Sequence, residues 1–98
     1  MLAVKSTMEK EDQGKITVLL FGYLKEATGK KRLKVIGRGT FLETLVEIRK
    51  QYPSLDAKMD TATYVVLLNG VSLLGKDLSQ VTIRDGDIIT LVPFAAGG

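Results

Sequence analysis

The sequence contains neither cysteine nor histidine. The absence of cysteine excludes disulfides, thiolate metal sites and a cysteine nucleophile, and it is typical of proteins in a reducing cytoplasm. The absence of histidine removes the most common general base at neutral pH and the usual ligand of transition metals. The composition therefore argues against a self-contained hydrolase or a zinc enzyme. We expect no catalytic residue, no metal and no bound cofactor.

Long apolar runs are also missing near the N-terminus. Lys5 interrupts the apolar residues 1–4, and residues 9–12 are all charged. This pattern fits neither a signal peptide nor a membrane span, so we expect a cytoplasmic protein with no membrane partner. Residues 1–14 show no helical or strand period, which predicts a flexible leader before a single domain over residues 15–98.

Basic residues exceed acidic ones only slightly, giving a formal net charge of +3. Four of them cluster at Lys30, Lys31, Arg32 and Lys34, but no series of aromatic residues lies between them. Proteins that bind single-stranded nucleic acid combine the two. A solvated strand face accounts for the cluster, and we expect no nucleic-acid partner. Binding of nucleic acid through residues 30–34 remains the weaker alternative.

The first half of the chain predicts two strands and a helix. Residues 16–23 are rich in β-branched and aromatic residues, and residues 31–36 alternate basic and apolar side chains, so a turn containing Gly29 would join them as a hairpin. Thr40 and Glu43 have the spacing of a capping box, which predicts a helix from Thr40 to Tyr52, stopped by Pro53. Its apolar stripe, predicted to face the core, contains Phe41, Leu42, Leu45, Ile48 and Tyr52.

The second half predicts three more strands. Asn69 and Gly70 separate two apolar runs within residues 64–74, which is a strong signal for a type I′ hairpin turn. A turn at Asp85-Gly86 leads into a last strand over residues 87–92. The order strand, strand, helix, strand, strand, strand predicts an α+β domain. Its expected architecture is a β-grasp, a mixed sheet with one main helix packed on one face.

One helix can cover only one face of this sheet, yet two of the predicted strands are apolar on both faces. If Ile16 faces the helix, Leu19 and Phe21 face away from it, and Ile88 and Val92 oppose their neighbours in the same way. An exposed apolar patch on a small domain often marks a docking surface. We therefore expect partner docking here; cover by the leader or by a second copy is the alternative.

Three stretches of the chain resemble the ubiquitin-like sulfur-carrier family. This family includes the small subunit of molybdopterin synthase, the thiamin-pathway sulfur carrier and the small archaeal modifier proteins. The similar stretches are "LFGYLKEATG", the central "LNG" and "IRDGDIITLVPFAAGG", with its Asp-Gly-Asp, strand, proline and final Gly-Gly. Lys25 stands where the family often has arginine, and Phe94 stands where a second proline is common. The choice between the molybdopterin and thiamin carriers stays open at this point.

The resemblance implies a carrier that an adenylating enzyme of the ubiquitin-activating type activates with ATP at the carboxylate of Gly98. A thiocarboxylate would then deliver sulfur, with the large subunit of molybdopterin synthase as a partner, or the activated carboxyl would be joined to lysines of target proteins. The residues expected to thread into the enzyme are Phe94, Ala95, Ala96 and Gly97, and the expected docking residues are Leu19, Phe21, Lys25, Ile88 and Val92.

The physical chemistry of the tail is consistent with this reading. A carboxylate is a poor electrophile, so its activation as a mixed anhydride with AMP needs a site that excludes water. Two glycines lack Cβ atoms and can pass a narrow channel in conformations that other residues resist. A β-grasp interaction module with no chemistry at its terminus remains the competing hypothesis.

Overall fold

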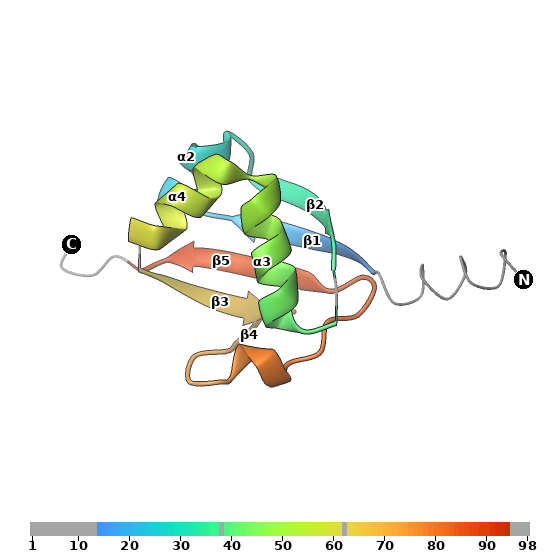
Figure 1. Ribbon diagram of the computed structural model, residues 1–98. Helices are drawn as coiled ribbons and strands as arrows, with labels where there is room; N and C mark the ends of the chain where they lie inside the picture. The colour runs from blue at the N-terminus through green and yellow to red at the C-terminus, as the bar shows by residue number, and fades with distance from the viewer. Residues whose placement is uncertain (1–13, 38, 62, 95–98) are drawn as a thin grey trace, which may run out of the picture.

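The computed structural model of the chain describes residues 14–37, 39–61 and 63–94 (Figure 1). Of the predicted leader, only Gly14 is among them. The elements run in the order β1 (Lys15–Leu20), α2 (Gly22–Thr28), β2 (Arg32–Ile36), α3 (Phe41–Gln51), α4 (Pro53–Thr61), β3 (Tyr64–Leu68), β4 (Val71–Ser72), the 3-10 helix η1 (Leu78–Gln80) and β5 (Ile88–Pro93). None of the helices in these ranges has the length and apolar character needed to span a bilayer.

The five strands form one mixed sheet in the order β2-β1-β5-β3-β4. The central strands β1 and β5 are parallel, with Val18 opposite Ile89 and Leu20 opposite Leu91. β2 pairs with β1, and β3 with β5, in the antiparallel sense. Because β1 and β5 are parallel, the chain enters the sheet at one end and leaves it at the other (Figure 1).

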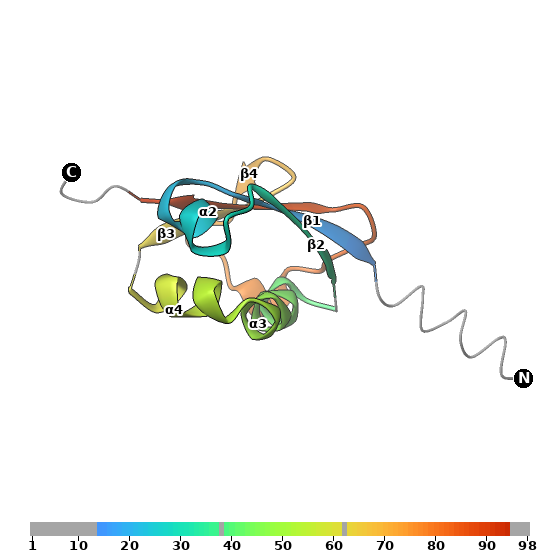
Figure 2. The same ribbon diagram turned by 90° about the horizontal axis from the view of Figure 1, so that it is seen from above.

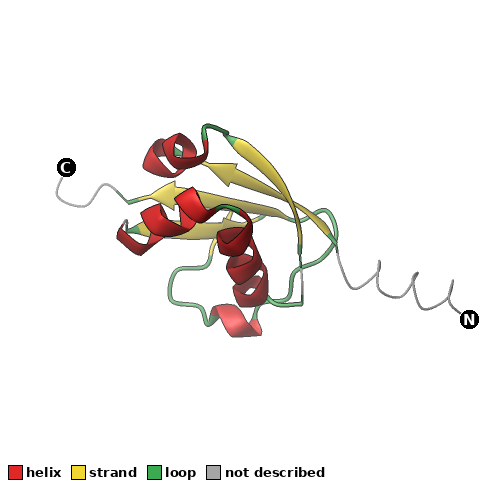
Figure 3. Cartoon of the chain, turned by 45° about the horizontal axis from the view of Figure 1, so that its top comes forward, coloured by secondary structure: helices red, strands yellow, loops and turns green. Residues whose placement is uncertain are grey.

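The helices α3 and α4 lie against one face of the sheet and enclose the core (Figures 2 and 3). Alternate residues of β1 and β5 point toward these helices and are buried, as a strand with one covered face requires. The inward side chains with no exposed surface are Ile16, Val18, Leu20, Ile89 and Leu91 from the strands and Leu24, Phe41, Ile48 and Leu55 from the helices. The predicted α+β architecture is confirmed.

The predicted hairpin between residues 16 and 36 is wrong in one respect, because its connection is a helix rather than a turn. β1 ends at Leu20, three residues before the predicted end, and α2 follows at once. Gly22, at φ +55°, turns the chain out of the sheet, and Gly29, at φ +72°, ends the helix in the left-handed conformation. Seven residues with a single buried side chain, Leu24, are too few to show a helical period in the sequence.

The long helix is confirmed at its start and corrected at its end. The hydroxyl of Thr40 accepts from the Glu43 amide at 3.1 Å, and a Glu43 carboxylate oxygen accepts from the Thr40 amide at 3.0 Å, which completes the predicted capping box. Pro53 does not stop helical structure, because it occupies the first position of α4, where a missing N–H costs nothing. The predicted stripe is also wrong at Leu42, which is 44% exposed and lies outside the core.

The side chain of Arg49 joins the two helices by pairing with Asp56 and Asp60 of α4. The hydrogen bonds that the guanidinium group donates to these carboxylates raise its pKa, with the Asp56 bond as the larger cause. These partners lie seven and eleven residues away in sequence, across the junction at Pro53. The ion pairs therefore fix the angle at which α4 leaves α3.

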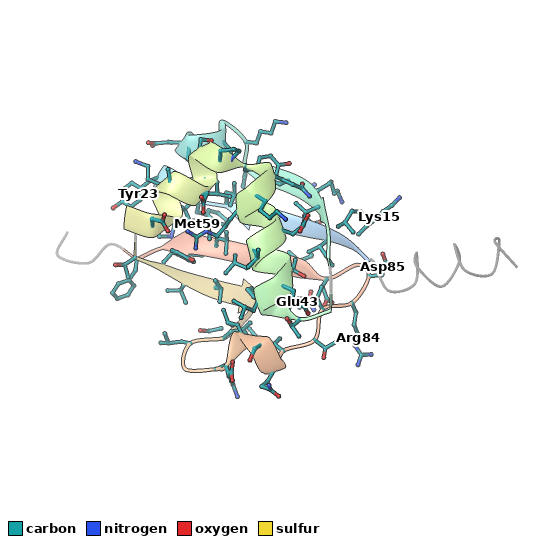
Figure 4. The ribbon with its side chains drawn as sticks, viewed as in Figure 1. Lys15, Tyr23, Glu43, Met59, Arg84 and Asp85 are labelled. Atoms are coloured by element: carbon teal, nitrogen blue, oxygen red, sulfur yellow. The ribbon has the colours of Figure 1, made fainter. Side chains whose placement is uncertain are left out.

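The two predicted turns in the second half are confirmed. Asn69 and Gly70 both have positive φ, 51° and 83°, as a type I′ turn requires. The Asn69 side chain also accepts from the Ile88 amide at 2.9 Å, which ties this turn to the start of β5. In the second turn, Asp85 accepts from the backbone amide of Lys15 at 2.8 Å. Figure 4 shows these two residues together where β1 begins.

Candidate functional site

The sheet face opposite α3 and α4 is called the open face. Among the described residues, no helix covers it (Figure 2). Because paired residues share a face, the strand register assigns its members. They are Lys15, Thr17 and Leu19 of β1, Arg32, Lys34 and Ile36 of β2, Val65 and Leu67 of β3, and Ile88, Thr90 and Val92 of β5.

The open face has an apolar part over β5 and β3 and a basic border along β2. Four predicted docking residues lie in or beside the apolar part: Ile88 is 40% exposed, Leu19 and Val92 are half-buried, and Phe21, directly after β1, is 38% exposed. On the border, the Lys34 ammonium group donates to the Thr17 hydroxyl at 2.9 Å. The structure therefore brings these four docking candidates together; their role in binding stays a prediction.

Phe21 and Lys25 are positioned by α2. Phe21 is the N-cap of this helix, and its carbonyl accepts from the amides of Leu24 and Lys25 at 3.1 and 3.3 Å. The Lys31 ammonium group lies 5.8 Å from the centre of the Phe21 ring, within the range of a cation–π contact. Lys25 is exposed on the helix itself, so it is not a member of the open face. Any partner that contacts both must reach from the sheet onto α2.

The last described residues, Pro93 and Phe94, are called the tail root. Pro93 ends β5 opposite Tyr64 of β3, and the Phe94 amide donates to the Thr63 carbonyl at 2.7 Å. Phe94 is 57% exposed. The other predicted threading residues, Ala95, Ala96 and Gly97, and the predicted site of activation, Gly98, lie outside the described residues. The fold thus holds the chain through Phe94.

Tyr64 connects the tail root to the helical layer. Burial raises the pKa of its phenol, while the nearby charge of Arg49 lowers it and that of Asp60 raises it. The phenol is therefore neutral over the physiological range. The Tyr64 side chain packs against the core, and Tyr64 is the residue of β3 that pairs with Pro93.

The described residues contain no candidate metal centre. In the ranges 14–37, 39–61 and 63–94, no three acidic side chains lie close enough to hold a metal ion. A hollow of about 520 Å³ is lined by Lys15, Lys34, Val35, Ile36 and Gln51, which places it away from the tail root. The arrangement offers an open sheet face that is apolar over β5, with the tail root at the end of this same strand.

Sequence reasoning missed two contributors to the tail root. Thr63 is invisible in the pattern because it acts through its backbone carbonyl. Gly22 lies against the Pro93 ring, and the sequence offers only a weak signal for it, a single glycine within the predicted strand 16–23. Neither residue carries side-chain chemistry.

The architecture, a five-stranded mixed sheet with helices on one face, defines a class, the ubiquitin-like β-grasp proteins. The ThiS family model matches residues 18–98, so the chain belongs to the ThiS family. This match runs from the middle of β1 to residue 98. The predicted relationship to the ubiquitin-like sulfur carriers is thereby confirmed. No curated protein sequence matches the chain.

Solved structures give the same fold. The solution structure of small archaeal modifier protein 1 from Methanosarcina acetivorans is similar with a TM-score of 0.72 at 22% identity, over 88% of this chain and 98% of that one. The crystal structure of that modifier protein from Haloferax volcanii gives 0.71 at 26% identity, over 87% and 100%. A chain in the complex of subunits 1 and 2 of the molybdopterin-converting factor from Helicobacter pylori is similar with a TM-score of 0.61 at 21% identity, over 86% of this chain and 99% of that one.

Proposed function

We propose that the chain is a sulfur carrier activated at the carboxylate of Gly98. The observation that carries the proposal is the position of the last strand: β5 ends at Pro93, and the sequence continues for five residues to Gly97-Gly98. Membership of the ThiS family supports this use of the terminus. The carrier itself supplies no catalytic group.

The chemistry belongs to an adenylating enzyme. A carboxylate oxygen of Gly98 attacks the α-phosphorus of ATP, and pyrophosphate leaves to give the mixed anhydride with AMP. Hydrosulfide then attacks the carboxyl carbon, displaces AMP and gives the thiocarboxylate directly. A persulfide donor displaces AMP to give an acyl disulfide instead, and a thiol must then attack the donor sulfur, forming a new disulfide with it and releasing the thiocarboxylate. The low bulk of the two glycines lets this carbon enter a site that excludes water.

The open face is the proposed docking surface for that enzyme and for a sulfur-accepting partner. Its apolar part lies over β5, the strand that leads directly to the tail root. A partner bound there would hold the chain end beside its own active site. The complex of subunits 1 and 2 of the molybdopterin-converting factor supports a protein partner, and we propose molybdenum cofactor synthesis as the pathway.

A second candidate function is conjugation to lysines of other proteins. The observation that favours it is the similarity to two small archaeal modifier proteins. Both functions begin with the same adenylate, so they differ only in the nucleophile that attacks it. Hydrosulfide, or a persulfide followed by thiol cleavage, gives the thiocarboxylate, whereas a lysine amine gives an isopeptide bond.

Two changes at the terminus test the proposal. Deletion of Gly98 withdraws the carboxyl carbon by one residue, about 3.5 Å of extended chain, and Gly97→Val adds a branched side chain where a narrow channel would admit only backbone. We expect both changes to abolish ATP-dependent adenylation while the free energy of unfolding changes by no more than about 0.5 kcal/mol. Intact mass of the carrier, measured with the activating enzyme and ATP, reports the adenylate.

Ala95→Val is the matched control, since it places the same valine side chain two residues earlier. It should be adenylated far better than Gly97→Val. If the chain without Gly98 is adenylated and thiolated as fast as the full chain, the carrier function is refuted and the interaction-module hypothesis takes its place.

A further inference from the structure

Gly22 and Pro93 lie in direct contact at the tail root. A Cβ atom built on Gly22 would lie 2.9 Å from Cγ of Pro93, 3.6 Å from Cδ and 3.7 Å from Cβ, so its three nearest neighbours belong to one proline ring. Gly29, at the other end of the same helix, offers a contrast. It also has positive φ, but a Cβ atom there would meet nothing within 4 Å.

The contact follows from the parallel pairing of β1 and β5. Leu20, the last residue of β1, is opposite Leu91. Two residues later in each segment, Gly22 therefore comes beside Pro93. At Gly22 the segment that follows β1 turns away from the sheet into α2, while β5 continues to the tail root. Because the backbone after Gly22 leaves the sheet, space opens beside this glycine, and the Pro93 ring fills it.

Pro93 also suits this place through its missing N–H. Successive amides of a strand point to opposite neighbours, and the Phe94 amide donates to Thr63 on the β3 side. The nitrogen of residue 93 therefore points to the β1 side, where β1 has already ended at Leu20. An ordinary residue would leave an unpaired donor there, and proline leaves none. The tail root is thus fixed from both sides, by the Phe94 bond and by the seat of the ring on Gly22.

We propose that Gly22 is a positioning residue that sets the point and direction from which the tail carries Gly98 to the activating enzyme. This inference rests on the proposed function. The four residues after Phe94 span at most about 14 Å when extended, so a threaded tail has little slack. A Cβ atom on Gly22 needs about 3.5 Å from the ring carbons instead of 2.9 Å, which displaces the tail root by roughly 0.5 to 1 Å.

The test compares Gly22→Ala with Gly29→Ala as the matched control. Both put a side chain on a left-handed residue at an end of α2, but only the first presses on Pro93. Adenylation by the activating enzyme is measured as ATP–pyrophosphate exchange against carrier concentration. Since misplacement of about 1 Å can cost up to about a hundredfold in rate, we expect kcat to fall at least about tenfold for Gly22→Ala, with KM within about twofold. Gly29→Ala should keep both constants.

A double variant separates positioning from general damage. Pro93→Ala removes Cγ and Cδ, the two ring atoms nearest to the new Cβ, and by itself it should lower kcat at unchanged KM because the ring no longer seats the tail root on Gly22. In the Pro93→Ala background, Gly22→Ala should lower kcat no further than Gly29→Ala does. This outcome is readable even if Gly22→Ala alone does not fold.

Three results would overturn the inference: equal kcat for Gly22→Ala and Gly29→Ala, wild-type kcat for Pro93→Ala, or an undiminished Gly22→Ala effect in the Pro93→Ala background. They leave the proposed function standing, provided that the wild-type chain is adenylated. Absence of adenylation of the wild-type chain would instead refute the proposed function itself.

Discussion

Ile88 and Ile89 are neighbours on β5 with the same side chain and opposite surroundings. Ile88 is 40% exposed on the open face, whereas Ile89 is fully buried in the core. Ile89→Ala removes three buried carbons and leaves a cavity, which costs about 2 to 5 kcal/mol. Ile88→Ala should cost at most about 1 kcal/mol, chiefly from lost strand preference. A 98-residue domain has a total stability of about 5 to 15 kcal/mol, so only the Ile89 change approaches unfolding.

The assay is thermal unfolding followed by circular dichroism. At about 4 to 8 °C per kcal/mol for a domain of this size, Ile89→Ala should lower Tm by about 8 °C or more, and Ile88→Ala by about 8 °C or less. The two substitutions delete identical atoms one residue apart, so their difference isolates the surroundings. Equal losses, or a larger loss for Ile88→Ala, would show that the assignment of the two sheet faces is wrong.

Three further predictions concern the open face, the cap of α3 and the phenol of Tyr64. Phe21→Glu should change the free energy of unfolding by about 1 kcal/mol or less yet sharply weaken the complex with the activating enzyme, and unchanged affinity by calorimetry would count against docking there. Thr40→Ala should cost about 0.5 to 2 kcal/mol in urea unfolding, and no loss would contradict the observed capping box. Because burial raises the pKa of Tyr64, its contribution to stability is complete below the unfolded value near pH 10 and is lost as pH rises through the higher folded value. Tyr64→Phe should therefore lose less stability than wild type in urea titrations above about pH 10, and parallel losses would contradict the burial.

The sequence predicts the sheet and the start of the long helix because these depend on local patterns. Side chains alternate between the two faces of a strand, so Ile88 and Ile89 of β5 lie on opposite faces, as expected. The spacing of Thr40 and Glu43 marks the start of α3. Asn69-Gly70 works for the same reason, since positive φ at two residues is a local demand. Each of these signals is complete within a few residues.

The missed features depend on contacts between distant segments. α2 is held by one buried leucine and by its contact with α4, where the Ser54 hydroxyl donates to the Ala27 carbonyl at 2.7 Å. Pro53 looks like a stop signal, but in the folded chain it starts a second helix that Arg49 braces. The role of Gly22 depends on Pro93, seventy-one residues later, and only the parallel pairing of β1 and β5 brings the two together.

The central claim concerns the carboxyl group of Gly98, and the most direct measurement is the intact mass of the chain recovered from the cells that make it. The account predicts a population in which one oxygen of the terminal carboxylate is replaced by sulfur, and this population should disappear when the activating enzyme is absent. An isopeptide bond between Gly98 and a lysine of another protein would shift the account to conjugation. A free, unmodified carboxylate on every molecule, with or without the activating enzyme, would contradict it.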